Sequence, residues 1–499
     1  MEPIGFITMY YPFVDGETRG ILESLMEKSE DFQDFITRLG KRVCSEDVPL
    51  SLVFIAAVWS MRGEVKEIQE MLAKKYEGNL MIIPWTFSPF NPTDRKALEA
   101  KMVGLLDDAI ASEPDDWILL HLLLRRTTVL VATPEGIQSF DDAKNLVDEN
   151  SELECFRPEI RHGEARIKDY EGDMKSTIEI YYEVLGNARK QGNEYLTATT
   201  LLDLGDKISL TDSKKALQFI EEAYRISKGL GMPTMERSAL QRMKSIAQKF
   251  GEYDLALKCL FDVLESPYAP SHVVAHLPLD ISSLYSDLGE GKEALSWVMN
   301  YEEKEIDEGP AGLSGHGCPY LYRARALLLL NRTDEALENI EILKEIAFRT
   351  GWELWLAGHY YVSGLYEIAM GQMATGITTI QSALETYERL NIQSGVNRSL
   401  IALTRAEIMS YDAEKSNLDP RDSGPWMIRL EKESTDMNLT GILMQHAMLK
   451  AEFQTKLGQI DAARETLETA LEISNQPSVK TLRKQILAKI DELEKTTIA

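Results

Sequence analysis

Hydrophobic and polar positions recur along most of the chain with the period of amphipathic helices, and short turns built on Gly or Asn separate these helices. Four of the turn segments share one pattern and occupy residues 251–257, 289–295, 331–337 and 458–464. In each segment a small residue falls five positions after the turn residue. The pattern predicts a helix, a tight turn and a second helix, repeated along the chain.

The small residue after each turn is an anchor from which the repeat period can be measured. The anchors are Thr177, Ala216, Ala256, Ala294, Ala336, Gly376 and Ala463. Their spacings are 38 to 42 residues except for the last, which is 87 and therefore predicts a hidden repeat between Gly376 and Ala463. The position twelve residues before the anchor is also small in five of the seven repeats, namely Ala165, Ser282, Ala324, Gly364 and Ala451. In the other two repeats, Gly205 and Ser245 lie one step away. Small residues at both positions let the two helices of a pair approach closely.

Two further parts of the chain fit this scheme. An earlier pair is predicted at residues 115–132 and 134–150, with Ala143 as its anchor and Thr133 as the N-cap before a proline. The hidden repeat is predicted to contain helices at 396–411 and 426–437, joined by a loop that is rich in proline and glycine. The solenoid would then hold about nine helix pairs.

The two ends of the chain depart from the period. We expect residues 1–112 to form an N-terminal helical region, residues 113–475 a solenoid, and residues 476–499 a C-terminal capping helix. The expected N-terminal helices cover residues 18–27, 31–43, 49–61 and 64–76. Residues 80–92 contain three prolines and should be extended. This segment either packs between helices or lies in the groove of the solenoid as an internal plug.

The combination of a small residue in the first helix, a turn glycine and a small residue opening the second helix resembles the tetratricopeptide repeat (TPR) family. The resemblance covers roughly residues 115–475. The period near 40 is longer than the usual 34 of that family and is similar to the lengthened repeats of kinesin light chains and of the sensor arms of signalling NTPases. The resemblance implies an all-α, right-handed superhelix of antiparallel helix pairs, in which the first helix of each pair lines the concave groove.

Composition narrows the possible partners. The 499 residues include 80 acidic and 54 basic side chains, which gives a net charge of −26 and disfavours nucleic acid and anionic membrane surfaces. The longest apolar stretch, 117–132, is interrupted by His121, Arg125 and Arg126, so no membrane span is expected. The N-terminus lacks the basic start of a signal peptide, and the four cysteines lie far apart. We expect a cytoplasmic protein without disulfides.

The sequence offers little support for catalysis. Residues 289–293 lack the loop and hydroxyl of a nucleotide-binding Walker motif, and His272 with His276 has helical spacing but no evident third metal ligand. Residues 312–316 miss the pattern of a serine-hydrolase elbow by one position. We therefore predict a protein that is not an enzyme and needs no cofactor or metal.

Aromatic and basic residues on the predicted inner helices are the candidate partner-binding residues. They are Tyr320, Tyr322, Arg323, Arg325, Trp355, His359, Tyr360, Asn397, Arg398 and Arg405. Some must belong to the core, because aromatic residues at helical spacing usually pack between helices. The alternative is a groove whose arginines bind a carboxylate or an acidic peptide. The lysine and asparagine pattern of the TPR carboxylate clamp is not recognisable.

Together these features predict a non-enzymatic scaffold or adaptor that binds a partner peptide or protein in the concave groove. The alternative is a regulatory module that senses a peptide or small ligand and acts on a separately encoded transcription factor or NTPase. The sequence identifies neither the partner nor the oligomeric state.

Overall fold

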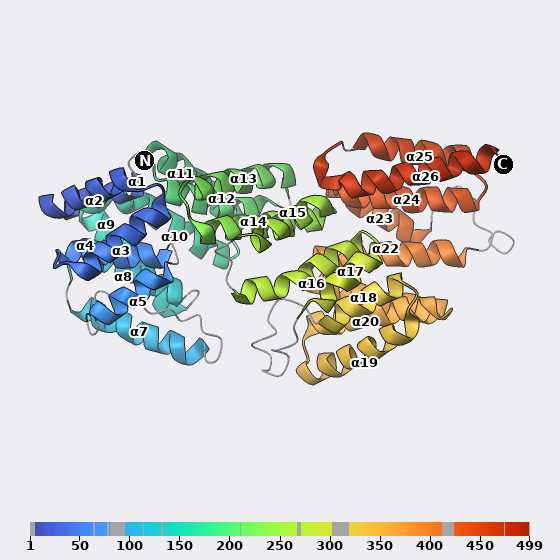
Figure 1. Cartoon of the computed structure of the whole chain (residues 1–499), viewed down its shortest axis with the longest axis horizontal. Coiled ribbons are helices and arrows are strands. Elements are labelled where there is room, and N and C mark those ends of the chain that lie inside the picture. Colours follow the sequence, from blue (N-terminus) through green and yellow to red (C-terminus); the bar gives the residue numbers. More distant parts are fainter. Residues whose placement is uncertain are drawn as a thin grey trace. The chain divides into compact units, whose positions relative to one another are not determined.

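The computed structural model describes residues 5–62, 65–76, 79, 95–112, 114–130, 133–209, 211–266, 271–301, 319–411, 424–473 and 475–498. Within these ranges every regular element is a helix (Figure 1). The chain divides into two compact units, Met1–Arg242 and Met243–Ala499, so that the division falls inside α14. The predicted boundaries near residues 112 and 475 stay predictions, and the segments 80–92 and 312–316 lie outside the described residues.

The first unit consists of short helices at its start and then of packed helix pairs. Its elements are α1 (Gly5–Thr8), η1 (Tyr11–Phe13), α2 (Gly16–Lys28), α3 (Phe32–Ser45), α4 (Leu50–Arg62), α5 (Lys66–Lys75), α7 (Arg95–Ala111), α8 (Asp116–Val129), α9 (Pro134–Glu149), η3 (Ser151–Phe156), α10 (Arg157–Tyr170), α11 (Met174–Lys190), α12 (Glu194–Ile208), α13 (Ser213–Gly229) and the first part of α14 (Pro233–Phe250). The pairs α8–α9, α10–α11 and α12–α13 pack in succession. As predicted, Thr133 caps α9, because its hydroxyl accepts a hydrogen bond of 3.1 Å from the backbone N–H of Gly136.

The second unit continues the same arrangement. Its helices are α15 (Tyr253–Leu264), α16 (Ser271–Asp287), α17 (Gly291–Met299), α18 (Pro319–Leu329), α19 (Thr333–Thr350), α20 (Glu353–Ala369), α21 (Met373–Arg389), α22 (Gln393–Ser410), α23 (Pro425–Asp436), α24 (Thr440–Lys456), α25 (Ile460–Ile473) and α26 (Lys480–Ile498), with the short η5 (Pro477–Val479) before α26. The pairs run from α16–α17 to α24–α25, and each also contacts the next. Helices α22 and α23 are the hidden repeat, and α26 packs on α25 as the predicted cap.

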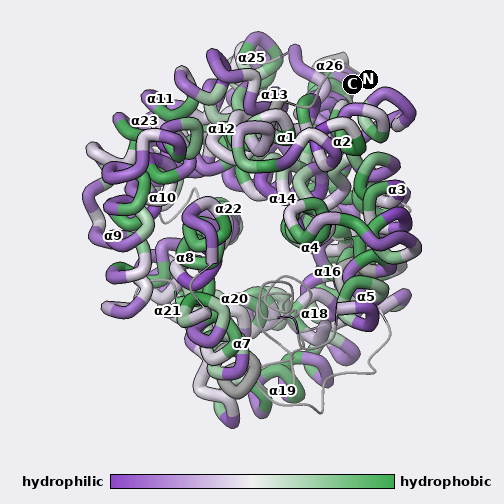
Figure 2. Tube along the Cα trace, turned by 90° about the vertical axis from the view of Figure 1, so that its left-hand side faces the viewer, coloured by the Kyte–Doolittle hydropathy of each residue, from purple (hydrophilic) through white to green (hydrophobic). Residues whose placement is uncertain are grey.

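The all-α, TPR-like solenoid of helix pairs is thus confirmed. Along most helices hydrophobic and hydrophilic positions alternate with the helical turn (Figure 2). The turn residues show why Gly and Asn mark the repeats: Gly251, Gly289, Asn331 and Gly458 have φ angles of 73°, 78°, 56° and 76°. Side chains other than Asn and Asp rarely adopt this left-handed conformation. In the described residues no helix combines the length and hydropathy needed to cross a bilayer.

The anchor residues confirm the predicted close packing of the helix pairs. Ala143 and all seven anchors from Thr177 to Ala463 are buried. A close approach occurs between α20 and α21, where a Cβ on Gly364 would lie 2.7 Å from the carbonyl oxygen of Gly376. Gly205 makes the equivalent close approach to α13, as expected, whereas Ser245 is exposed and does not.

We expect the substitution Gly364→Ala to destabilise the second unit by about 1–3 kcal/mol, because the added methyl group would meet the backbone of α21. This loss would outweigh the gain of about 1 kcal/mol that alanine normally brings to a helix. The measurement is chemical denaturation, with amide hydrogen exchange in α20 and α21 as the local readout. The exposed Thr378→Ala on α21 is the control and should be slightly stabilising. Equal stability of Gly364→Ala and wild type would contradict the close crossing.

The first and last helices of the second unit lie against each other. The turn between α14 and α15 contacts the start of α24, where a Cβ on Gly441 would lie 2.0 Å from the carbonyl oxygen of Gly251. Asp254 on α15 accepts hydrogen bonds of 2.8 and 2.6 Å from the backbone N–H and hydroxyl of Thr481. The side-chain amide of Gln485 donates a 2.8 Å hydrogen bond to the carbonyl oxygen of Leu288. Residues that are far apart in the sequence therefore hold α14, α15 and α16 against α24 and α26.

Candidate functional site

The ten predicted partner-binding residues lie on three consecutive inner helices of the second unit. Tyr320, Tyr322, Arg323 and Arg325 belong to α18, Trp355, His359 and Tyr360 to α20, and Asn397, Arg398 and Arg405 to α22. The structure brings only three of them, Arg325, Arg398 and Arg405, to one cavity. The role of the set in partner binding stays a prediction, and the geometry separates its members into distinct groups.

The first group packs in the core. Trp355 is buried and its ring lies 5.2 Å from that of Trp352. His359 is buried as well, and burial, followed by the charge of Lys344, lowers its pKa. Tyr322 packs against the buried cluster that contains Leu279. The observed contacts of these three residues are those of core side chains packed between helices.

The second group binds to other parts of the same chain. The buried amide of Asn397 donates a 2.9 Å hydrogen bond to the carbonyl oxygen of Lys249 and accepts one of 2.9 Å from Gln393. Tyr320 and Arg323 contact each other through a cation–π interaction, with 5.7 Å between the guanidinium carbon and the ring centre. Asn397, Tyr320 and Arg323, which the sequence predicts to bind a partner, are therefore in contact with residues of this chain.

Arg325 and Arg398 share one buried carboxylate, that of Asp287 at the end of α16. Nη2 of Arg325 lies 2.5 Å from Oδ1, and the guanidinium of Arg398 donates through Nε and Nη2 to both oxygens, at 2.7 and 2.8 Å. Burial alone would raise the pKa of Asp287, but the two arginines outweigh burial and lower it. Three helices are thereby joined by an ion cluster with two positive charges and one negative charge.

This ion cluster forms part of the wall of a cavity of about 700 Å³ in the second unit, which we call the inner cavity. Its lining comes from the inner helices α16, α18, α20, α22 and α24, together with α15 and α26. Most of the lining is apolar and includes Leu328, Leu365, Ile368, Met409 and Met448. Arg405 is exposed there and makes no ion pair with the residues that the structure describes.

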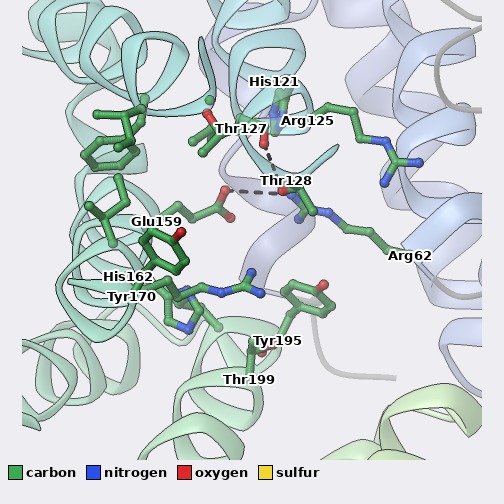
Figure 3. Close-up of a pocket in the computed structure, with 18 of the residues that line it drawn as sticks. Arg62, His121, Arg125, Thr127, Thr128, Glu159, His162, Tyr170, Tyr195 and Thr199 are labelled. Carbon is green, nitrogen blue, oxygen red and sulfur yellow. Dashed lines mark hydrogen bonds and ion pairs between the residues drawn. The ribbon is translucent and has the colours of Figure 1, made fainter. Parts of the chain in front are cut away.

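A second cavity, of about 360 Å³, lies in the first unit and was not predicted (Figure 3). We call it the arginine pocket, because Arg62, Arg125 and Arg166 line it with Glu159 as the only acidic side chain among its lining residues. Nη2 of Arg62 lies 3.8 Å from Oε2 of Glu159, which is an ion pair at the edge of contact distance. The pocket is thus locally basic in a strongly acidic protein.

Arg62 is held in place by aromatic rings. Its guanidinium carbon lies 4.6 Å from the ring centre of Trp59 and 5.0 Å from that of Tyr195. The two rings are perpendicular to each other, with 5.2 Å between their centres. Nη1 of Arg62 is buried and has no hydrogen-bond partner among the described residues. The rings therefore fix the guanidinium in orientation, and one of its buried donors is left without a hydrogen-bond partner.

Burial also shifts the pKa of two side chains contributed by α8. It lowers the pKa of Arg125 to about 10, with a further contribution from the charge of Arg62. The same two causes lower the pKa of His121 well below its usual value, so His121 is neutral at pH 7. Nε of Arg125 is buried without a hydrogen-bond partner in the described chain. Arg125 also makes no ion pair with the residues that the structure describes, so its charge is poorly compensated.

His162, which also lines the pocket, faces the carboxylate of Asp203 at 3.3 Å. Arg242 donates two hydrogen bonds of 3.2 Å to the same carboxylate. Burial would raise the pKa of Asp203, but His162 and Arg242 outweigh it and lower that pKa to about 2. Nη1 of Arg242 also lies 2.6 Å from Oδ2 of Asp206, so this arginine has two acidic partners, in contrast to Arg62 and Arg125.

Sequence reasoning missed the arginine pocket because its members come from α4, α8 and α10. The available signal was Arg125, which interrupts the apolar stretch 117–132 and was considered only as an argument against a membrane span. No sequence spacing links Arg125 to Arg62 or Glu159. Of the two histidines at helical spacing, His272 and His276, the first has a side chain outside the described residues, and the described chain contains no cluster suited to a metal ion.

Comparison with known proteins gives only distant structural likenesses. No protein-family model matches the sequence, and no curated protein matches it. Similar structures include yeast Tom70, with 12% identity, a TM-score of 0.33 and coverage of 89% of this chain and 95% of that chain. The APC/C hetero-tetramer Cut9–Hcn1 follows with 16% identity, a TM-score of 0.32 and coverage of 89% and 90%. The P58(IPK) TPR domain has 16% identity, a TM-score of 0.24 and coverage of 87% and 99%. The description as TPR-like rests on the helix pairs of this chain.

Proposed function

We propose that the protein is a non-enzymatic interaction scaffold whose second unit binds an apolar segment of a partner protein in the inner cavity. The observation that carries this proposal is the cavity itself, which is about 700 Å³ in volume and lined mainly by side chains of the inner helices. Met409 and Leu329 line it with 52% and 37% of their surfaces exposed. Exposed apolar side chains in a concave site are typical of surfaces that bind a partner.

The charged residues of the cavity support an occupant that also carries an acidic side chain. The cluster of Arg325, Arg398 and Asp287 has a net charge of +1, and Arg405 adds an exposed guanidinium on the same helix as Arg398. Lys489 and Glu452, with 3.8 Å between their charged atoms, form a balanced pair in the lining, and the exposed Glu492 also lines the cavity, so that its charged side chains sum to +1. The acidic group of a partner would be favoured near Arg405.

The test is recovery of partners from native extract on the full chain, with Met409→Glu as the variant and Met370→Glu as its control. Both methionines are about half exposed, at 52% and 50%, but only Met409 lines the cavity. We expect wild type and Met370→Glu to retain the same proteins, and Met409→Glu to lose one or more of them by at least tenfold. Each lost protein is then purified, and its Kd is measured for wild type, Met409→Glu and Met370→Glu. Identical sets of retained proteins and equal affinities would overturn the proposal.

A second candidate function is a regulatory module that senses a small ligand and acts on a separately encoded transcription factor or NTPase. One observation favours it: the arginine pocket of the first unit is lined by charged and apolar side chains, and it has the size of a small-molecule site. The resemblance to kinesin light chains and NTPase sensor arms stays a prediction.

A further inference from the structure

We propose that the arginine pocket binds a small organic acid, with its carboxylate at Arg62 and its apolar body among the side chains of α8, α9, α10 and α12. This inference concerns the first unit and does not depend on the inner cavity. It rests on the uncompensated charge in the pocket, on the fixed orientation of Arg62, and on the apolar character of the remaining lining.

The charge balance favours a single negative charge on the ligand. The interior side chains Arg62 and Arg125 carry two positive charges, and Glu159 supplies one negative charge. Arg166 also lines the pocket but is exposed, so water compensates its charge. A monoanion would neutralise the interior, whereas a dianion such as a phosphate monoester would leave an excess negative charge against an apolar wall.

Arg62 has the geometry of a carboxylate anchor. Its guanidinium plane is fixed by Trp59 and Tyr195, so little side-chain entropy would be lost on binding. Figure 3 shows Arg62 extending into the pocket toward Glu159, whereas Arg125 extends from α8 away from Glu159. The carboxylate of a ligand would therefore bind at Arg62, and the charge of Arg125 would contribute to the attraction at longer range.

The rest of the pocket suits an apolar or aromatic body. Its lining includes Leu124, Ile137, Phe140, Ile167 and Tyr170. A volume of about 360 Å³ is at the lower end of the range for small-molecule sites. The neutral ring of His121 in the lining adds no charge that would compete for the carboxylate.

The test is a thermal-shift and calorimetry screen of the full-length protein. The probes are acetate, hexanoate, phenylacetate and 3-phenylpropionate, each paired with its neutral primary amide, and phenyl phosphate as the dianion. We expect at least one of the larger carboxylates to raise Tm at millimolar concentration, since a ligand that binds only the folded state stabilises it. Its amide and phenyl phosphate should bind at least tenfold more weakly. Failure of every carboxylate to bind, equal binding of an amide, or tighter binding of phenyl phosphate would overturn the proposal.

Variants place the ligand within the pocket. Arg62→Lys keeps the positive charge but loses the planar pair of donors. Arg125→Gln removes a positive charge and leaves the contacts of Arg62 with Trp59 and Tyr195 in place. We expect each to raise the Kd of the best carboxylate at least tenfold. Arg157→Gln is the control, because Arg157 lies on α10 with Glu159 but pairs outside the pocket with Glu154 and Asp148. It should change the Kd less than twofold.

Glu159→Gln gives a result of opposite sign. This change removes the carboxylate that competes with a ligand for Arg62, so we expect tighter binding of the same probe and a lower Tm of the ligand-free protein. A purely structural role of Arg62 and Glu159 would lower the Tm without tightening binding, and would thus contradict the proposal. Because Met409→Glu lies in the other unit, it should leave carboxylate binding unchanged, which separates this test from that of the scaffold function.

Discussion

Replacing Asp287 with Asn is expected to destabilise the second unit by roughly 3–5 kcal/mol, since the change leaves two buried guanidinium groups without a counter-ion. The side chain of Asp287 is only 3% exposed, and those of Arg325 and Arg398 are 6% and 18% exposed. Water can therefore not replace the lost carboxylate. Ser283 accepts hydrogen bonds from both arginines, at 3.3 and 3.1 Å, but its hydroxyl carries no charge.

The loss should be largest near neutral pH. The folded-state pKa of Asp287 is below its unfolded value of 3.8, so the carboxylate contributes its full stability above about pH 4. That contribution is lost as the pH falls through the folded-state pKa. Wild type should therefore lose stability on acidification more steeply than Asp287→Asn, and the two stability curves should converge at low pH.

Guanidinium denaturation, followed by amide hydrogen exchange in α16, α18 and α22, measures this effect within the second unit. The matched control is Glu335→Gln, which breaks the ion pair between Glu335 and Arg332. The side chains of these two residues are 53% and 45% exposed, respectively. Such an exposed pair should have no measurable effect. An unchanged exchange rate in Asp287→Asn would show that the arginines do not depend on this carboxylate.

Replacing Gly441 with Val is expected to have the second large effect, a loss at or above the upper end of about 1–3 kcal/mol. A Cβ at this position would lie 2.0 Å from the carbonyl oxygen and 2.3 Å from the carbonyl carbon of Gly251. These are backbone atoms, so a change of rotamer cannot relieve the clash. Gly251 itself has a φ of 73°, which fixes the turn that would have to move.

We expect Gly441→Val to destabilise particular helices of the second unit. Helix α24 would move away from the turn between α14 and α15, and the hydrogen bonds from Thr481 to Asp254 and from Gln485 to Leu288 would weaken with it. Amide exchange should therefore increase in α24 and α26, while the pair α20–α21 keeps its protection. Gly186→Val on α11 is the control, because nothing lies within 4 Å of the added Cβ. Equal effects of the two substitutions would contradict the contact between Gly251 and Gly441.

The helix pairs were predictable because each rests on local rules. A helical period of apolar residues, a turn residue that tolerates positive φ and a small residue at the crossing are all visible within about 40 residues. The structure accordingly shows buried residues at every anchor and a hidden repeat at α22–α23. Ser245 is exposed, which shows that a small residue near the expected helix crossing is not necessarily buried there.

The sites were less predictable, because they depend on contacts between residues that are distant in the sequence. Arg325 and Arg398 lie on α18 and α22 and both line the inner cavity, but their common partner Asp287 is separated from them by 38 and 111 residues. No local sequence pattern indicates that a carboxylate on α16 pairs with both of these arginines. The same holds for the arginine pocket, whose Arg62, Arg125 and Glu159 lie on three helices.

The sequence by itself thus determined the all-α class, the succession of helix pairs and the helices that carry the arginines, because periodicity and turn chemistry act over short distances. Only the tertiary structure decided which charges are compensated and which remain available to a ligand. Asp287 neutralises part of one arginine cluster, whereas Arg125 has no acidic partner among the described residues. Such differences arise from the packing of helices far apart in the chain, which places or withholds a counter-ion within a few ångströms of each guanidinium.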